Sequence, residues 1–193
     1  ITEIDHFQHN WNEKSATTWN TNLVVCYSKG KGFYENYKEN AKFSGYGLTT
    51  IIMGGTTINK TDLIRQKSLD NDFYGPTFSA NYKDEKLDVI LGGGYNKYEG
   101  SHFGKIIWAR YASTSELEDR YYNDAASKTD GNIFAKANYQ VAEKLSLFAD
   151  LQLRNVHYKA NGAETGVVNA NFNFFNPKAG LNLEINENNQ LYA

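Results

Sequence analysis

The sequence predicts an all-β fold, an antiparallel up-and-down meander of about 7–8 strands that forms a partial outer-membrane β-barrel with long loops at one end. Three observations carry this prediction. Side chains alternate in polarity along much of the chain, short charged turns join the strands in pairs, and much longer connections separate one pair from the next. Tight turns at one end and long loops at the other are typical of outer-membrane barrels.

The expected elements follow from these signals in order. Strands are predicted at residues 3–12, 17–33, 71–82, 87–98, 130–141, 145–158 and 176–185, with another beginning at Leu191. Short turns are predicted at residues 12–15, 83–86, 142–144 and 186–189, and long connections at residues 30–69, 99–129 and 159–174. Several strands exceed the 9–11 residues, roughly, that cross a bilayer in a tilted strand.

Alternation is clearest in the two strands after residue 129. Ile133, Ala135 and Tyr139 share one face of the first strand, whereas Asn132 and Lys136 lie on the other, because side chains alternate with a period of two. In a closed core, each such polar group would need a hydrogen-bond partner, because burying it without one costs about 1–3 kcal/mol of stability. We therefore expect the apolar face to touch lipid and the polar face to line a wet interior.

Aromatic residues gather near the predicted strand ends. Such residues form girdles where a barrel meets the two membrane surfaces, although Tyr is common in any strand. The girdle prediction comprises Trp11, Trp19, Tyr82, Tyr95, Tyr98, Tyr139 and Tyr158.

Composition narrows the class of protein. The 193 residues suit one domain, and 14 Tyr, 11 Phe and only two Pro favour β structure over a helix bundle. No apolar stretch approaches the ~20 residues of a transmembrane helix. Twenty basic residues balance 22 acidic ones without a basic stripe, which argues against a nucleic-acid partner. The single Cys26 excludes an internal disulfide framework.

No pattern in the chain predicts catalysis, a metal site or a cofactor. Residues 70–75 begin like a calcium loop, but Tyr74 occupies a liganding position and Asn81 stands where the bidentate Glu belongs. His6 and His9 are three apart, which places them on opposite faces of a strand. Nucleophile, zinc-protease and phosphate-loop motifs are absent from the sequence. We therefore expect no enzyme.

The long connections are rich in aromatic and arginine side chains, which commonly build recognition surfaces. We expect ligand binding by aromatic stacking and by charge-assisted hydrogen bonds from arginine. The predicted ligand-binding residues are His102, Trp108, Arg110, Tyr111, Tyr121 and Tyr122, with Tyr34 and Tyr37 next. The alternative for many of these aromatic residues is that long loops need small cores of their own. Residues 115–120 are compatible with a helical turn.

Several phrases of the sequence resemble the barrel of TonB-dependent receptors from Bacteroidetes. They are SKGKGFYENYK at residues 28–38, DLIRQKSLDNDFYG at 62–75, HFGKIIWARY at 102–111, FAKANY at 134–139, LFADLQ at 147–152 and FFNPKAGL at 174–181. The final Leu191, Tyr192 and Ala193 also resemble the start of a further strand in that family. The likeness covers nearly the whole chain.

The resemblance implies a barrel of about 22 strands, plugged by an N-terminal domain, in the outer membrane of a Gram-negative bacterium. Such receptors import a scarce nutrient, for example a siderophore, cobalamin, haem or an oligosaccharide. Residues 1–193 would then form a single partial barrel segment, without plug or closing strands. The implied partners are the nutrient at the extracellular loops, outer-membrane lipid, and TonB through the missing plug region, and the fragment is expected to self-associate.

Two other readings stay open at the level of sequence. A soluble β-barrel or sandwich that binds a small ligand would use the two faces inversely, with the leucines inside. A barrel hydrolase would need a Ser/His or Asp/His constellation at its rim, and no motif suggests one. We also expect the apolar face to be covered by a second copy or by the chain's own loops.

Overall fold

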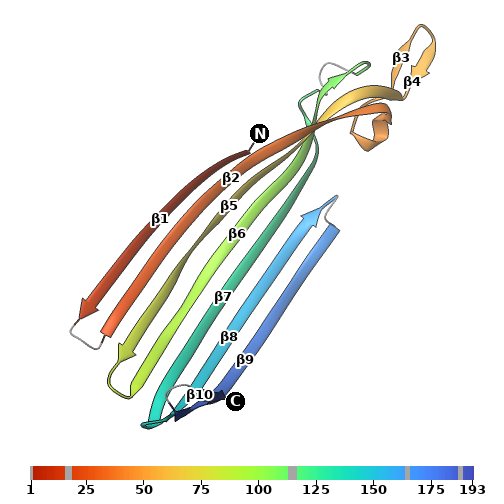
Figure 1. The fold of residues 1–193 in the computed structure, drawn as a ribbon. Helices are drawn as coiled ribbons and strands as arrows, with labels where there is room; N and C mark the ends of the chain where they lie inside the picture. Colours follow the sequence, from red (N-terminus) through yellow and green to blue (C-terminus); the bar gives the residue numbers. More distant parts are fainter. Residues whose placement is uncertain (1, 16–18, 113–116, 164–165, 187–188) are drawn as a thin grey trace.

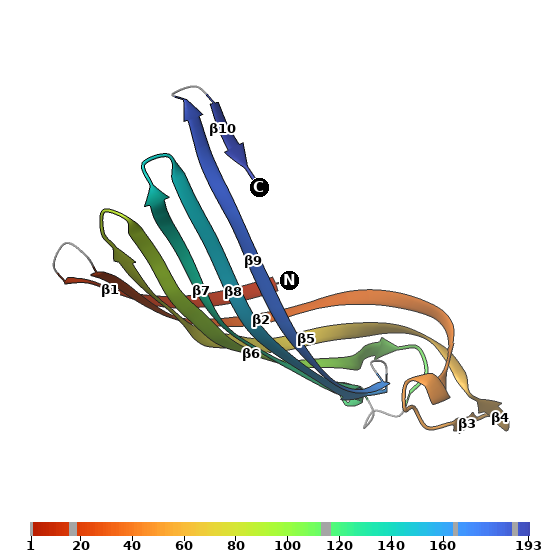
Figure 2. The same ribbon diagram turned by 90° about the horizontal axis from the view of Figure 1, so that it is seen from below.

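The chain forms a single curved layer of long antiparallel strands (Figures 1 and 2). The computed structural model describes residues 2–15, 19–112, 117–163, 166–186 and 189–193. The strands of the main sheet are β1 (Thr2–Ser15), β2 (Trp19–Lys42), β5 (Lys60–Lys83), β6 (Leu87–Ala109), β7 (Arg120–Ala142), β8 (Leu145–Gly162), β9 (Gly166–Asn186) and β10 (Asn189–Tyr192), hydrogen-bonded in that order. The predicted antiparallel meander in an open, partial barrel is confirmed.

The predicted loop asymmetry is found in part. The strand ends that flank the short turns lie together at one end of the sheet (Figure 1), and residues 43–59 and 110–119 form longer connections at the other end, but only residues 163–165 separate β8 from β9, so the long connection predicted at 159–174 is wrong. In the turn between β5 and β6, the Asp84 amide donates to the Leu87 carbonyl at 2.9 Å. The predicted turn at residues 12–15 is wrong, since those residues continue β1. Residues 187 and 188 of the last predicted turn lie outside the described residues, as do residues 115 and 116 of the predicted helical turn.

The long connections are much shorter than predicted, because the strands continue through most of them. β2 runs to Lys42 and β5 begins at Lys60, so only residues 43–59 connect them. This connection contains a 3-10 turn, η1 (Phe43–Gly45), and a small separate hairpin of β3 (Ile51–Met53) and β4 (Thr56–Ile58). The strand signal fades after residue 33 because both faces become polar there, whereas backbone pairing needs no contrast between the faces.

Strand register assigns each side chain to one of two faces. Lys136 lies opposite Asp150, and Ala137 lies opposite Ala149, so the two faces alternate as predicted. We name the aspartate face after Asp124, Asp130 and Asp150, whose side chains are all buried. We name the other the leucine face, after Leu23, Leu91, Leu147, Leu151, Leu153 and Leu181.

The leucine face divides into two zones along the strands. The zone next to the short turns, the apolar belt, comprises Trp19, Leu23, Val25, Tyr27, Tyr74, Phe78, Tyr82, Leu91, Tyr95, Ile133, Tyr139, Leu147, Leu151, Leu153, Phe175 and Leu181. The zone beyond it, the polar crown, comprises Lys29, Lys31, Asp70, Asp72, Lys97, Glu99, Ser127, Thr129, Asn155, His157, Lys159, Asn169, Asn171 and Asn173. On β2 the belt runs over nine residues, Trp19 to Tyr27, close to the 9–11 residues, roughly, of a membrane-crossing strand.

Aromatic side chains mark both edges of the apolar belt. At the edge near the short turns, the Trp19 and Tyr82 rings lie with centroids 5.1 Å apart. At the edge near the crown stand Tyr27, Tyr74 and Tyr95. The girdle prediction therefore agrees with the register for most of its members. It is wrong for Tyr98 and Tyr158, which both pair with Lys128 and so lie on the aspartate face.

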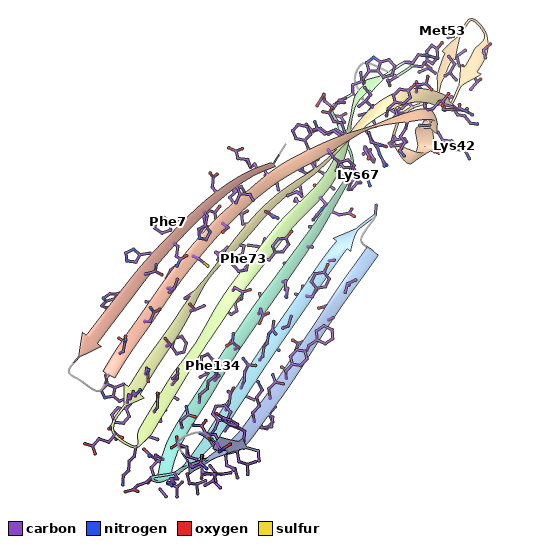
Figure 3. All side chains as sticks on the ribbon, viewed as in Figure 1. Phe7, Lys42, Met53, Lys67, Phe73 and Phe134 are labelled. Carbon is purple, nitrogen blue, oxygen red and sulfur yellow. The ribbon has the colours of Figure 1, made fainter. Side chains whose placement is uncertain are left out.

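Among the residues that the structure describes, no second layer covers either face of the sheet (Figure 3). Ile133 and Leu153 in the belt are 57% and 56% exposed. The described loops instead pack on themselves at the far end, where Phe43, Leu48, Leu63 and Ile106 form a small buried cluster. Covering of the apolar face by the chain's own loops is thus wrong within the described residues. The leucines of these residues also do not meet in a closed, dry centre, because the sheet is open.

Candidate ligand-binding site

A hollow of about 620 Å³ lies on the aspartate face near the loop end of the sheet. Side chains from successive strands line it, namely Tyr34 of β2, Lys67 of β5, His102 of β6, Tyr122 of β7 and Tyr158 of β8. Tyr34 and Lys67 are directly opposite each other in the register. The hollow therefore arises from long strands that keep their pairing well beyond the apolar belt.

The aromatic wall of the hollow depends on a glycine. Gly104 is paired with both Lys67 and Tyr122. A Cβ atom at this position would lie 2.4 Å from the Tyr121 and Tyr122 rings, so a larger residue would displace them. With Gly104 in place, the Lys67 ammonium sits 5.3 Å from the centroid of the Tyr122 ring. This is a cation–π distance, and it places a cation and an aromatic face side by side.

Asp124 contributes a buried carboxylate to the lining. Its side chain is 1% exposed, and its Oδ1 accepts a hydrogen bond of 2.8 Å from the Ala163 backbone amide. A Cβ atom at Gly162 would lie 1.9 Å from the carboxylate carbon, so the chain closes tightly over it. Asp124 therefore anchors the connection between β8 and β9.

The predicted ligand-binding residues divide into separate groups. Tyr34, His102 and Tyr122 line the hollow. Trp108 and Tyr37 are both paired with Ile64, which places them on the opposite face of the sheet.

The remaining predicted residues pack near the loop cluster. Arg110 joins the Trp108 side, where its guanidinium lies 3.3 Å from the Asp62 carboxylate. The Tyr121 ring packs against Tyr46 with centroids 5.1 Å apart, so it forms part of a small loop core, as the alternative reading expected. The Tyr111 backbone amide donates to the Thr61 hydroxyl at 2.9 Å.

Asp62 holds the second group together. The Asn40 backbone amide donates to its carboxylate at 2.9 Å, and this bond lowers the pKa of Asp62, helped by the Tyr37 hydroxyl and the Arg110 guanidinium. The pKa of Tyr37 is raised, first by burial and then by the nearby Asp62 charge. This carboxylate thus connects β2, β5 and the end of β6.

The lining of the hollow also includes residues that are not among the predicted ligand contacts, such as Lys67, Asp124 and Tyr158. Lys67 lies in a segment predicted to be a loop, and Tyr158 was assigned to the girdle. Continuing the two-residue alternation past the strand predicted at residues 71–82 would have placed Lys67 on the face of Tyr34. Tyr158 already lies on that face of the strand predicted at residues 145–158.

The structure offers no site for a bound metal among the residues it describes. Those residues contain no group of three or more His, Cys, Asp or Glu side chains with suitable geometry. The described part of the chain also has no helix that is long and apolar enough to cross a membrane.

Comparison with known proteins identifies the family. The domain family described as TonB dependent receptor-like, beta-barrel, matches residues 2–193. The chain therefore belongs to this family. This is a family of receptors rather than enzymes, which fits the absence of catalytic motifs, and its members are proteins of the Gram-negative outer membrane.

Solved structures give the same fold. The chain is similar to the closed form of the ferric-catecholate import receptor Fiu from E. coli K12, with a TM-score of 0.61 and 14% identity, covering 99% of this chain and 32% of that one. For the open form of Fiu the TM-score is 0.58 and the identity 13%, covering 99% and 34%. The chain thus spans about a third of the length of these receptors. No curated protein sequence matches the chain.

Proposed function

We propose that the chain is a barrel-wall and extracellular-loop segment of a Bacteroidetes-type TonB-dependent receptor that imports a scarce nutrient across the outer membrane. The single observation that carries the proposal is the division of the leucine face into an apolar belt and a polar crown. A nine-residue belt with aromatic edges suits the lipid core of a bilayer. The opposite, aspartate face then lines the wet lumen.

In this orientation the hollow of Tyr34, Lys67, His102, Tyr122 and Tyr158 opens toward the lumen at its extracellular end. Lys67 supplies a positive charge, and the tyrosines supply flat faces and hydroxyl groups. This chemistry suits an anionic ligand with aromatic rings. A ferric catecholate, the cargo named for Fiu, is the ligand class we propose from among siderophores, cobalamin, haem and oligosaccharides.

Binding of a ferric catecholate to the full-length receptor in detergent tests this proposal. Lys67→Met and Tyr122→Leu should each weaken the affinity roughly tenfold, because each removes a cation–π or stacking partner. The matched controls are Lys31→Met in the crown and Tyr82→Leu at the short-turn edge, which lie outside the hollow. Equal affinities for the hollow variants and the controls would contradict the proposed site.

Trp108 and Arg110 remain proposed contacts for a ligand that approaches the loop end from the other face. Trp108→Ala and Arg110→Ala should then weaken binding of the same ferric catecholate. Unchanged affinity would remove both from the site. Loss of binding in these variants alone, with the hollow variants unaffected, would move the site to that face.

A further inference from the structure

Two hollows lie end to end on the leucine face, across the boundary between belt and crown. The lower one, of about 730 Å³, is lined by Phe78, Tyr95, Ile133 and Leu153 of the belt and reaches Asn155 at its upper end. The upper one, of about 960 Å³, is lined by crown residues of the same strands. They follow one another along the same strands, the lower one lined mainly by apolar residues and the upper one by charged residues; we refer to the two hollows together as the track.

A missing side chain opens the lower hollow. Gly131 is paired with Tyr95 on one side and Asn155 on the other, so it leaves a gap in that row of the leucine face. A Cβ atom there would meet only Tyr95, at an ordinary contact distance of 3.5 Å. The position therefore has room for a side chain, and nothing in the backbone packing demands glycine.

The upper hollow is lined by three cations, Lys29, Arg120 and Lys159, and by three carboxylates, Asp70, Asp72 and Glu99. Its carboxylates are already paired, since Lys29 lies 2.9 Å from Asp70 and 3.0 Å from Asp72. Glu99 is likewise paired with Lys97, at 2.8 Å.

Lys159 and Arg120 have no carboxylate partner among the described residues. The Arg120 guanidinium stacks 3.7 Å from the centroid of the Phe103 ring and donates to the Asn123 amide oxygen at 2.9 Å. Both cations line the upper hollow and remain available to an anion.

The spacing of the two hollows suits a lipid. Lys159 follows Asn155 by four residues, which is about 13 Å along a strand. In a strand tilted by about 45° this distance rises roughly 9 Å along the membrane normal. A head-group layer has a similar thickness of about 5–8 Å on each side of the hydrocarbon core. Lys159 therefore stands where the head of a lipid with its chain in the groove would lie, and Arg120 lines the same hollow further from the belt.

We propose that this track is a binding site for one acylated lipid, with a chain in the groove at Gly131 and a phosphate-bearing head at Lys159 and Arg120. The proposal rests on the membrane orientation given under Proposed function. It goes beyond that function because it assigns a defined lipid to one place on the outer wall of the barrel. Continuity of the groove with the lipid-facing belt selects a lipid as the occupant.

Native mass spectrometry of the full-length, delipidated receptor tests the site, with dimyristoyl phosphatidylglycerol as the probe. Gly131→Leu fills the groove and should lower the affinity of the first bound lipid roughly tenfold, by displacing about two methylene groups. Lys159→Gln should lower it about fivefold. The matched controls, Ala137→Leu in the belt and Lys31→Gln in the crown, lie outside both hollows and should bind as the wild type does.

Dimyristoyl glycerol, which lacks the phosphate, separates the two halves of the site. Its binding should fall with Gly131→Leu and stay unchanged with Lys159→Gln. Unaltered phosphatidylglycerol binding in the Gly131→Leu receptor would overturn the proposal, as would an equal loss in the two controls.

Membrane fractionation and ferric catecholate binding, measured on the same variants, separate this proposal from the proposed function. If only the lipid site is wrong, the wild-type receptor will still be found in the outer-membrane fraction and will still bind the ferric catecholate. A wild-type receptor absent from the outer-membrane fraction would instead contradict the function itself.

Discussion

Arg154 on β8 donates two hydrogen bonds to the carboxylate of Asp130 on β7, and one of them joins Nε to Oδ1 at 2.8 Å. The Asp130 side chain is 9% exposed and the Arg154 side chain 43%. The pair lies on the aspartate face, and Lys128 approaches the same carboxylate at 3.8 Å. A two-pronged contact of this kind fixes the relative position of two neighbouring strands.

Breaking that pair should loosen the barrel wall. Arg154→Met in the full-length receptor should lower the urea midpoint of unfolding in detergent, because it leaves a largely buried carboxylate with a distant lysine only. Asp130→Asn should also lower it, and the double variant should lose less than the sum of the two. Additive losses would show that the two side chains do not act as a unit.

Truncation of the loop cluster should affect only the loop end. Leu63→Ala and Phe43→Ala remove side chains that are 0% and 2% exposed, at a cost of about 2–5 kcal/mol each. Hydrogen exchange should then accelerate in β3, β4 and η1 while the belt strands stay protected. Faster exchange throughout the belt would contradict the separation of the two regions.

Acid should release the Asp62 contact. The pKa of the Asp62 carboxyl is lowered in the folded state. Its carboxylate therefore stabilises the fold at pH values above the ordinary pKa of 3.8, and this stabilisation is lost as the pH falls through the lowered pKa. Exchange of the Asn40 amide should therefore rise steeply in that acidic range. The Asp62→Asn receptor is the control and should show faster exchange at neutral pH with a smaller acid step. Identical profiles for the two proteins would refute the coupling.

The boundary between belt and crown can be tested by labelling. In a Cys26→Ser background, Leu151→Cys should resist a charged maleimide in intact cells, whereas His157→Cys should react. The two positions share β8 and the leucine face, so only their height differs. Both should react after denaturation. Labelling of Leu151→Cys in intact cells would mean that the belt does not face lipid.

The sequence predicted the faces well where they differ in polarity. Ile133 and Asn132 lie on opposite faces as expected, because their difference in polarity follows the two-residue alternation of the strand. Prediction failed beyond residue 33, where both faces meet water and the alternation disappears. Lys67 was missed for that reason, and Trp108 was grouped with His102 although their strands place them on opposite faces. The face on which a residue lies is decided by the strand with which it pairs. That partner is distant in the sequence, so the residues nearby give no sign of it.

The strands beyond the belt also decide how far the loop end lies from the membrane surface in the proposed orientation. β5 leaves the belt at Tyr74 and continues as paired strand to Lys60, which is 14 residues away. At about 3.3 Å per residue and a tilt of about 45°, those residues rise roughly 33 Å. In the membrane orientation proposed above, that height is comparable to the hydrocarbon thickness, so a ligand would first meet a rigid sheet well outside the bilayer. Substitutions at the loop end would then lie about that far from the belt that we propose sits in the membrane.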